Sequence, residues 1–185
     1  MTVTPRQEQA EIRAAQHNRQ AFAPLYERYV DAVYGYCLRR LSDPEHAADT
    51  TAEVFTKALA TIGGFRGSSF RSWLFTIARN AVIDKYRSRK PTDQLPDSLE
   101  TGVAGPEELA MSRETSLELR AALTHLTGQQ QDVITLRLAG LNGKEIAAAM
   151  DMTLGAVKAT QARAFTRLRE LMVAPEEATK EGERV

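Results

Sequence analysis

Apolar residues recur every three or four positions along most of the chain, the spacing that lines one face of an α-helix. In the first ninety residues this pattern predicts four helices: one over 5–16, one from Asn18 to about Leu41, one over 44–62, and one from Ser68 or Ser69 to about residue 89. Asp43 followed by Pro44 is the strongest start signal, a capping acid before a proline at the first helical position. Gly63 and Gly64 end the third helix.

The second half predicts shorter helices in quick succession. Thr127 with Gln130, and Asn142 with Glu145, form two capping boxes, and Thr153 can cap a longer helix that follows. A short helix, a turn of about three residues and a second helix together indicate a helix-turn-helix unit. We expect its core to comprise Ile146, Ala147, Met150, Val157, Ala164 and Leu168.

Between these halves lies a segment with no sustained period. Residues 91–111 contain prolines, glycines and acidic residues but no basic residue, a composition typical of a linker. The fold class predicted is all-α, with two small helical domains joined by a flexible acidic linker. The predicted divisions are a first domain over 1–90, the linker over 91–114, a second domain over 115–173 and a disordered tail over 174–185.

The net charge of zero conceals four unlike segments. Residues 1–90 carry a net charge of +5, residues 91–115 carry −5, residues 116–173 carry +2 and the tail 174–185 carries −2. Two basic lobes are thus separated by an acidic connector, which favours nucleic-acid binding in both lobes and disfavours it in the connector.

Basic charge is densest in the fourth predicted helix and the loop before it. Residues 66–90 carry a net charge of +6. Asn80, Asp84 and Arg87 fall at i, i+4 and i+7, so they share one ridge beside the apolar face. A basic ridge with aromatic neighbours suits a phosphate backbone and unstacked bases, although a solvated amphipathic helix would show the same charge pattern.

Other functional classes find little support. Cys37 is the one cysteine, which excludes an intramolecular disulfide and favours a reducing cytoplasm. His17, His46 and His125 lack metal-ligand spacing, so we expect no zinc site and no other cofactor. No apolar stretch is long enough to span a membrane or typical of a signal peptide. There is no phosphate-binding loop, nucleophile elbow or paired-histidine motif, so we expect neither an enzyme nor a small-molecule substrate.

The run SSFRSWLFTIARNAVIDKYR resembles the promoter-melting segment of bacterial sigma factors of the extracytoplasmic-function family. The family pattern is a Gly/Ser loop followed by F-x-x-W-L-x-x-I-A-R-N-x-x-x-D-x-x-R. Its fixed positions are matched by Phe70, Trp73, Leu74, Ile77, Ala78, Arg79, Asn80, Asp84 and Arg87. The resemblance implies that the −10 promoter strand is bound by Arg66, Ser68, Arg71, Arg79, Asn80, Asp84 and Arg87. It places a pocket for an unstacked base at the Gly63–Ser69 loop and Asn80, with Trp73 read as core rather than as a melting wedge.

The third predicted helix also resembles a family segment. HAADTTAEVF is similar to A-E-D-x-x-Q-E-x-F, which docks on RNA polymerase, and this implies polymerase contacts by Asp49, Glu53 and Phe55. Ala48 and Ala52 replace the family's usual Glu and Gln. An acidic outer helix face is the alternative interpretation of this segment.

The second half resembles the −35-reading domain of the same family through L-T-x-x-Q-x-x-V-I-x-L-R, L-x-x-x-E-I-A-x-x-M and G-x-V-K. The implied −35 contacts are Arg137, Thr153, Lys158, Ala159, Ala162 and Arg163. Ala159 and Thr160 stand where the family usually has Ser and Arg, so we expect a different promoter preference and weaker binding.

Together these resemblances imply a cytoplasmic sigma factor that binds core RNA polymerase and directs promoter-specific transcription initiation. Its expected partners are core RNA polymerase, promoter DNA as −35 duplex and −10 single strand, and an anti-sigma protein. The alternative is a helix-turn-helix regulator that acts without polymerase. The segment SWLFTIARNAVID distinguishes the two, because such a regulator has no use for it.

Overall fold

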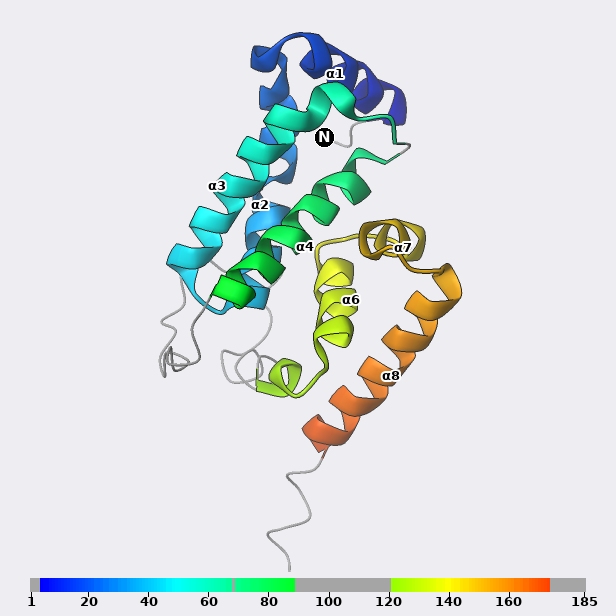
Figure 1. Ribbon diagram of the computed structural model, residues 1–185. Coiled ribbons are helices and arrows are strands. Elements are labelled where there is room, and N and C mark those ends of the chain that lie inside the picture. Colours follow the sequence, from blue (N-terminus) through cyan, green and yellow to red (C-terminus); the bar gives the residue numbers. More distant parts are fainter. Residues whose placement is uncertain (1–3, 68, 89–120, 174–185) are drawn as a thin grey trace, which may run out of the picture.

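The computed structural model describes residues 4–67, 69–88 and 121–173, and within them every regular element is helical (Figure 1). The elements are α1 (Pro5–His17), η1 (Arg19–Phe22), α2 (Ala23–Leu41), α3 (Pro44–Thr61), η2 (Ile62–Gly64), α4 (Phe70–Ser88), α6 (Gly128–Leu138), α7 (Gly143–Met150) and α8 (Leu154–Val173), with a further helical turn at 121–124. The all-α prediction is confirmed. Ser68, the predicted linker 91–114 and the predicted tail 174–185 lie outside the described residues. No helix in the described ranges is long and apolar enough to cross a bilayer.

The first lobe, residues 4–88, is a bundle of α2, α3 and α4 with α1 across one end (Figure 1). Asp43 caps α3 as predicted, its carboxylate accepting the His46 backbone N–H at 2.8 Å. The second helix begins later than predicted. Asn18 caps only the short 3₁₀ helix η1, and α2 starts at Ala23 because Pro24 has no N–H and belongs in a first turn.

The second lobe, residues 121–173, contains the predicted helix-turn-helix. Both capping boxes are formed, at Thr127 and at Asn142, and the Thr153 hydroxyl accepts the Ala156 N–H at 3.1 Å to cap α8. Asp151 takes the left-handed conformation, φ 52°, and so ends α7 and starts the turn. Every predicted core residue of this unit is buried.

The two lobes pack against each other, which the sequence pattern did not predict. Helix α4 lies against α7 and α2 lies against α6, and one continuous apolar cluster contains residues of both lobes. The reason lies in α4, where Phe75, Ala78 and Val82 are buried in addition to Phe70, Leu74 and Ile77. A helix buried around most of its circumference needs covering on a second side.

Candidate nucleic-acid interface

The loop before α4 is held from both sides. Phe70 is 1% exposed, and its ring centroid lies 5.9 Å from that of Phe65 and 5.4 Å from that of Trp73. Trp73 is partly buried and packs on the core. On the other side Gln16 of α1 donates from Nε2 to the carbonyls of Phe65, at 2.9 Å, and Ile62, at 3.3 Å. The loop is therefore fixed by aromatic packing beneath and by an amide from α1.

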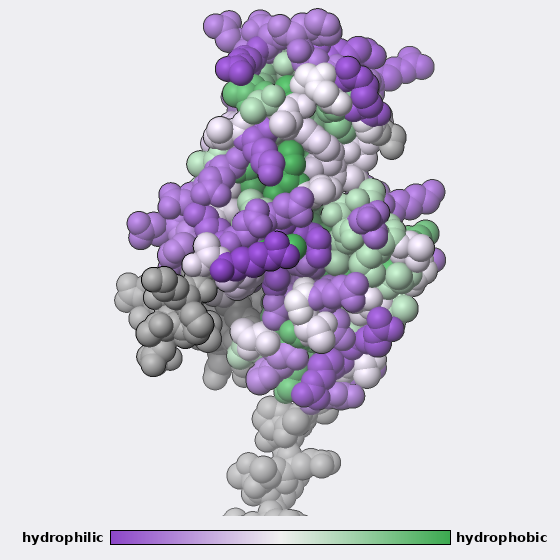
Figure 2. Space-filling model, viewed as in Figure 1, coloured by the Kyte–Doolittle hydropathy of each residue, from purple (hydrophilic) through white to green (hydrophobic). Residues whose placement is uncertain are grey.

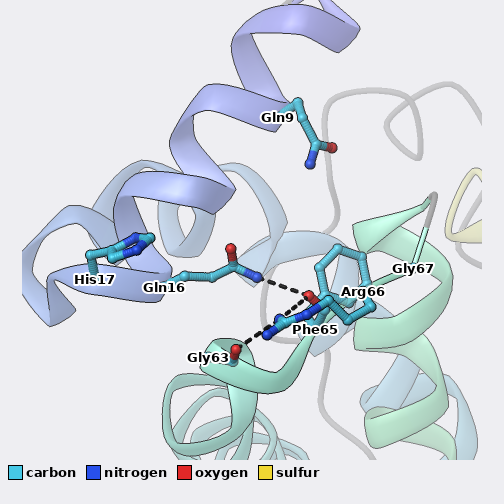
Figure 3. A pocket seen from close by; sticks show the side chains of 7 residues that line it. All are labelled: Gln9, Gln16, His17, Gly63, Phe65, Arg66 and Gly67. Carbon is cyan, nitrogen blue, oxygen red and sulfur yellow. Dashed lines mark hydrogen bonds between the residues drawn. The ribbon is translucent and has the colours of Figure 1, made fainter.

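A cavity of about 330 Å³ lies beside this loop (Figure 3). Its lining is mostly polar and comes from α1 and from the loop: Gln9, Gln16, His17, Gly63, Phe65, Arg66 and Gly67. The Arg66 guanidinium folds back onto the carbonyls of Gly63 and Phe65, at 2.9 and 2.8 Å. Asn80 is not among the lining residues, so the structure does not bring the two parts of the expected base pocket into one cavity.

The ridge on α4 is exposed as predicted. Asn80, Asp84 and Arg87 are all exposed, and the Asp84–Arg87 pair is long, at 3.9 Å, with both side chains more than 70% accessible. A pair this exposed contributes little stability. The ridge is thus free to meet a ligand, and its polar groups are not consumed by internal contacts.

Two arginines of the predicted −10 set point elsewhere. Arg79 Nε lies 2.8 Å from an Asp132 carboxylate oxygen, and Arg71 Nη2 donates to the Ala139 carbonyl at 2.8 Å. Both partners belong to the second lobe. The structure therefore divides the predicted set, with Asn80, Asp84 and Arg87 at the surface, and Arg71 and Arg79 engaged between the lobes.

The predicted polymerase contacts are also divided. Asp49 and Glu53 are exposed one turn apart on α3, and Glu53 pairs with Lys85 of α4 at 2.9 Å. Phe55 is 6% exposed and packs against the rings of Phe22 and Tyr26. Phe55 is therefore a core residue, and of the three predicted contacts Asp49 and Glu53 present their side chains at the surface.

On α8 the predicted groove-facing residues form one exposed strip comprising Lys158, Ala159, Ala162 and Arg163. Thr160 is 2% exposed, and its hydroxyl accepts from Arg163 at 3.2 Å, so it is a packing residue that orients the arginine. Arg137 donates to the Leu141 carbonyl at 3.1 Å and to Gln161 at 3.4 Å, which places it beside this strip. Thr153 acts locally as the cap of α8.

The surface is largely hydrophilic in the face shown in Figure 2, with apolar residues visible mainly between polar side chains. Among the described residues, no group of His, Cys, Asp and Glu is arranged to hold a metal ion.

Three residues with defined roles escaped the sequence interpretation. Gln16 holds the loop from α1, and Asp132 and Arg40 form an ion pair between the lobes at 3.0 Å. Burial raises the pKa of the neighbouring Tyr36 well above its usual value, and the Asp132 carboxylate raises it further. Of these three residues, only Asp132 could have been noticed in the sequence, because it is an acid next to the apolar residues of the helix predicted after Thr127.

The chain matches two family descriptions, in the order that the motifs predict. Residues 25–92 match Sigma-70 region 2 and residues 116–168 match Sigma-70 region 4. The helix α1, including Gln16, precedes the first match.

Comparison with individual proteins leads to the same family. The chain is 37% identical over 168 residues to BldN, an extracytoplasmic-function RNA polymerase sigma factor of Streptomyces coelicolor, covering 86% of this chain and 63% of BldN. It is 33% identical over 162 residues to the RNA polymerase sigma factor YlaC of Bacillus subtilis, covering 84% of this chain and 94% of YlaC. The solved structure of CnrH in complex with the cytosolic domain of CnrY shares the fold, with a TM-score of 0.71 at 23% identity over 90% of this chain and 97% of CnrH. This chain belongs to the extracytoplasmic-function group of the sigma-70 family of RNA polymerase sigma factors.

Proposed function

We propose that this sigma factor binds core RNA polymerase through α3, captures the −10 strand on α4 and its preceding loop, and reads −35 duplex with α8. The observation that carries the proposal is the exposure of two separate polar strips, Asn80–Asp84–Arg87 on α4 and Lys158–Arg163 on α8, one in each matched region. Both strips occupy positions that the family motifs assign to DNA.

The −10 contact requires a base held outside the stack. Unstacking costs a few kcal/mol and is offset by pocket contacts. The loop at 63–67 supplies a fixed backbone, a polar cavity and Arg66, while Asn80 offers an amide on the neighbouring exposed ridge. We assign Arg66 and Arg87 to phosphates, with Arg71 and Arg79 joining them once they leave the second lobe.

The −35 contact is a major-groove contact by a recognition helix. A lysine or arginine that is bidentate to guanine contributes about 1–3 kcal/mol of discrimination. Lys158 and Arg163 are the exposed basic side chains of the strip. Ala159 and Ala162 can make only apolar contacts, to a thymine methyl group or to the edge of a nucleobase. Losing Ser at 159 and Arg at 160 removes a donor and a charge, which supports a different −35 preference and weaker −35 binding.

The polymerase contact is assigned to the acids Asp49 and Glu53. Their exposure on one face of α3 supports this assignment, and the alanines at 48 and 52, also exposed, remove two of the family's usual polar contacts. The role proposed is one of binding and not of catalysis, and its place is the cytoplasm, where polymerase works. An anti-sigma protein is a further proposed partner, because the sigma factor RpoE of Bartonella quintana, which has a similar fold, has been solved in complex with the anti-sigma factor NepR.

The test is promoter binding by holoenzyme assembled from core polymerase and the full chain. Asn80→Ala is expected to weaken binding of a pre-melted −10 template without affecting core binding, and Lys158→Glu to abolish the dependence on the −35 sequence. Arg169→Glu, an exposed reversal of charge farther along α8, is the matched control. Equal promoter binding by all four proteins would contradict the two-strip assignment. Failure of the wild-type chain to bind core, with specific duplex binding retained, would favour a conventional helix-turn-helix regulator.

A further inference from the structure

A buried carboxylate joins the two lobes. Asp132 of α6 is 3% exposed and contacts three side chains of the first lobe: it forms an ion pair with Arg40, whose Nε lies 3.0 Å away, and accepts hydrogen bonds from Arg79 Nε at 2.8 Å and the Tyr36 hydroxyl at 3.4 Å. We call these four residues the Asp132 cluster. A charge this buried is tolerated only when it is paired, so the closed packing of the lobes depends on these partners staying in place.

Further polar contacts extend the same interface along α4. Arg71 Nη2 donates to the Ala139 carbonyl at 2.8 Å, Ser69 Oγ lies 3.3 Å from a Glu145 oxygen, and Thr76 Oγ1 lies 3.5 Å from the Ala149 carbonyl. Arg40 also bonds Gln131. Together with the shared apolar cluster, these contacts seat α6 and α7 along one side of α4.

The side that is covered is part of the proposed −10 surface. Arg71 and Arg79 belong to the set assigned to the −10 strand, and both are engaged by the second lobe. An Arg79 guanidinium paired with a buried carboxylate cannot also bind a DNA phosphate by the same edge, and a strand cannot reach Arg71 while α6 and α7 lie over it. Asn80 and Arg87 remain exposed in the same structure.

We propose that the second lobe is a built-in competitor for the −10 strand, and that the Asp132 cluster holds the chain in a closed state that binds this strand poorly. The proposal rests on the −10 role of α4 given above. Opening separates the lobes, frees Arg71 and Arg79, and lets each lobe reach its own promoter element. By linkage, whatever separates the lobes raises affinity for the strand, and the strand in turn favours the open state.

Asp132→Asn tests this directly in the full chain. The amide keeps the size of the side chain but leaves Arg40 and Arg79 as like charges without a counter-charge, which favours separation of the lobes. We expect a larger radius of gyration in solution scattering and about 5–150-fold tighter binding of a fluorescent single-stranded −10 oligonucleotide, the usual range for a coupling of this kind. Asp151→Asn is the matched control, because it removes one exposed acid of the same lobe at a left-handed position that asparagine tolerates.

A second chain closes the lobes covalently. Thr76 and Ala149 lie on facing elements, with Thr76 Oγ1 3.5 Å from the Ala149 carbonyl, so cysteines at both positions are chosen to form a disulfide across the interface, while Cys37 is fully buried. The oxidised chain is expected to bind the oligonucleotide no better than wild type and to show no gain when Asp132→Asn is added. A reducing agent should restore that gain. If Asp132→Asn alone unfolds, as judged by loss of its helical circular dichroism signal, the comparison of the oxidised and reduced double-cysteine chains tests the competitor role instead.

The outcomes separate the two proposals. Equal oligonucleotide binding by the wild-type, Asp132→Asn, oxidised and reduced chains would overturn the competitor role and leave the −10 surface intact. Failure of the disulfide to form in a folded chain, together with equal radii of gyration for the wild-type and Asp132→Asn chains, would overturn the closed state held by the Asp132 cluster. A third outcome would instead contradict the −10 role of α4. In it, Asp132→Asn has a larger radius of gyration than wild type, but no chain binds the oligonucleotide and the holoenzyme does not bind the promoter.

Discussion

Gln16→Ala tests whether α1 sets the conformation of the promoter-binding loop. The wild-type amide donates to two loop carbonyls, Phe65 at 2.9 Å and Ile62 at 3.3 Å, immediately before Arg66. Each such hydrogen bond contributes about 0.5–1.5 kcal/mol net, so losing both costs the loop about 1–3 kcal/mol. The change removes no group that the promoter motif assigns to DNA.

The expected consequence is a loss of affinity rather than a loss of fold. A cost near the middle of that range, about 2 kcal/mol, shifts the balance between native and displaced loop by roughly 30-fold. Because only the native loop is competent, the affinity for a −10 strand falls by about 3- to 30-fold, depending on how stable the loop was at the start.

The assay is fluorescence anisotropy of a labelled, pre-melted −10 template with holoenzyme, at a temperature well below the unfolding midpoint of either protein. Gln7→Ala is the matched control, since Gln7 lies exposed on the same helix and its side chain has no hydrogen-bond partner among the described residues. If Gln16→Ala lowers the unfolding midpoint but binds the template as tightly as Gln7→Ala, the residue is structural only and the loop-positioning argument is refuted.

Three further predictions concern stability and reactivity. Gly140→Ala should lower the melting temperature by several degrees relative to Gly128→Ala. An alanine in the left-handed conformation of residue 140 costs about 1–2 kcal/mol, and its Cβ would lie 2.8 Å from the Arg71 guanidinium, whereas a Cβ at position 128 would meet open space. Equal melting temperatures for the two variants would contradict this. Asp43→Ala should cost about 1 kcal/mol at pH 7 as a lost helix cap. A backbone N–H in the first turn of α3 lowers the pKa of Asp43, so this stabilisation is present above the unfolded pKa and lost as pH falls through the folded pKa. The melting temperatures of the wild-type and Asp43→Ala proteins should therefore converge in acid. A difference in melting temperature that stays constant with pH would argue against capping. Burial raises the pKa of the Cys37 thiol to about 11, so a thiol reagent at pH 8 should label it only after denaturation, and rapid labelling of the native chain would show that this core opens.

Helix boundaries were accessible from sequence because caps are local. Asp43, Thr127 and Asn142 each form their predicted bonds within three residues of themselves, so no tertiary information is needed to place them. The start of α2 was misplaced by the same logic, since Asn18 does cap a helix, but a short 3₁₀ one that stops before Pro24.

The packing of the two lobes could not be read in the same way. Asp132 and Arg79 are 53 positions apart, and nothing in either neighbourhood specifies the other. A partial signal existed in α4, where Phe75, Ala78 and Val82 add a second apolar stripe to the one formed by Phe70, Leu74 and Ile77. That stripe implies a further covering element but does not say which one.

The candidate site shows the same division. The ridge of Asn80, Asp84 and Arg87 follows from helical spacing alone and is exposed as expected. The positions of Arg71 and Arg79 depend on a second lobe, and the role of Gln16 depends on α1 crossing the end of the bundle.

The most direct test of the central claim is run-off transcription by core RNA polymerase, with and without the full chain, from a library of bacterial promoter fragments. The account predicts that the chain produces discrete transcripts absent with core alone, from templates that share a −10 and a −35 element, and that Asn80→Ala removes them. Transcription no different from core alone, while the full chain still binds particular duplex sequences, would contradict it and identify the chain's DNA contacts as those of a regulator.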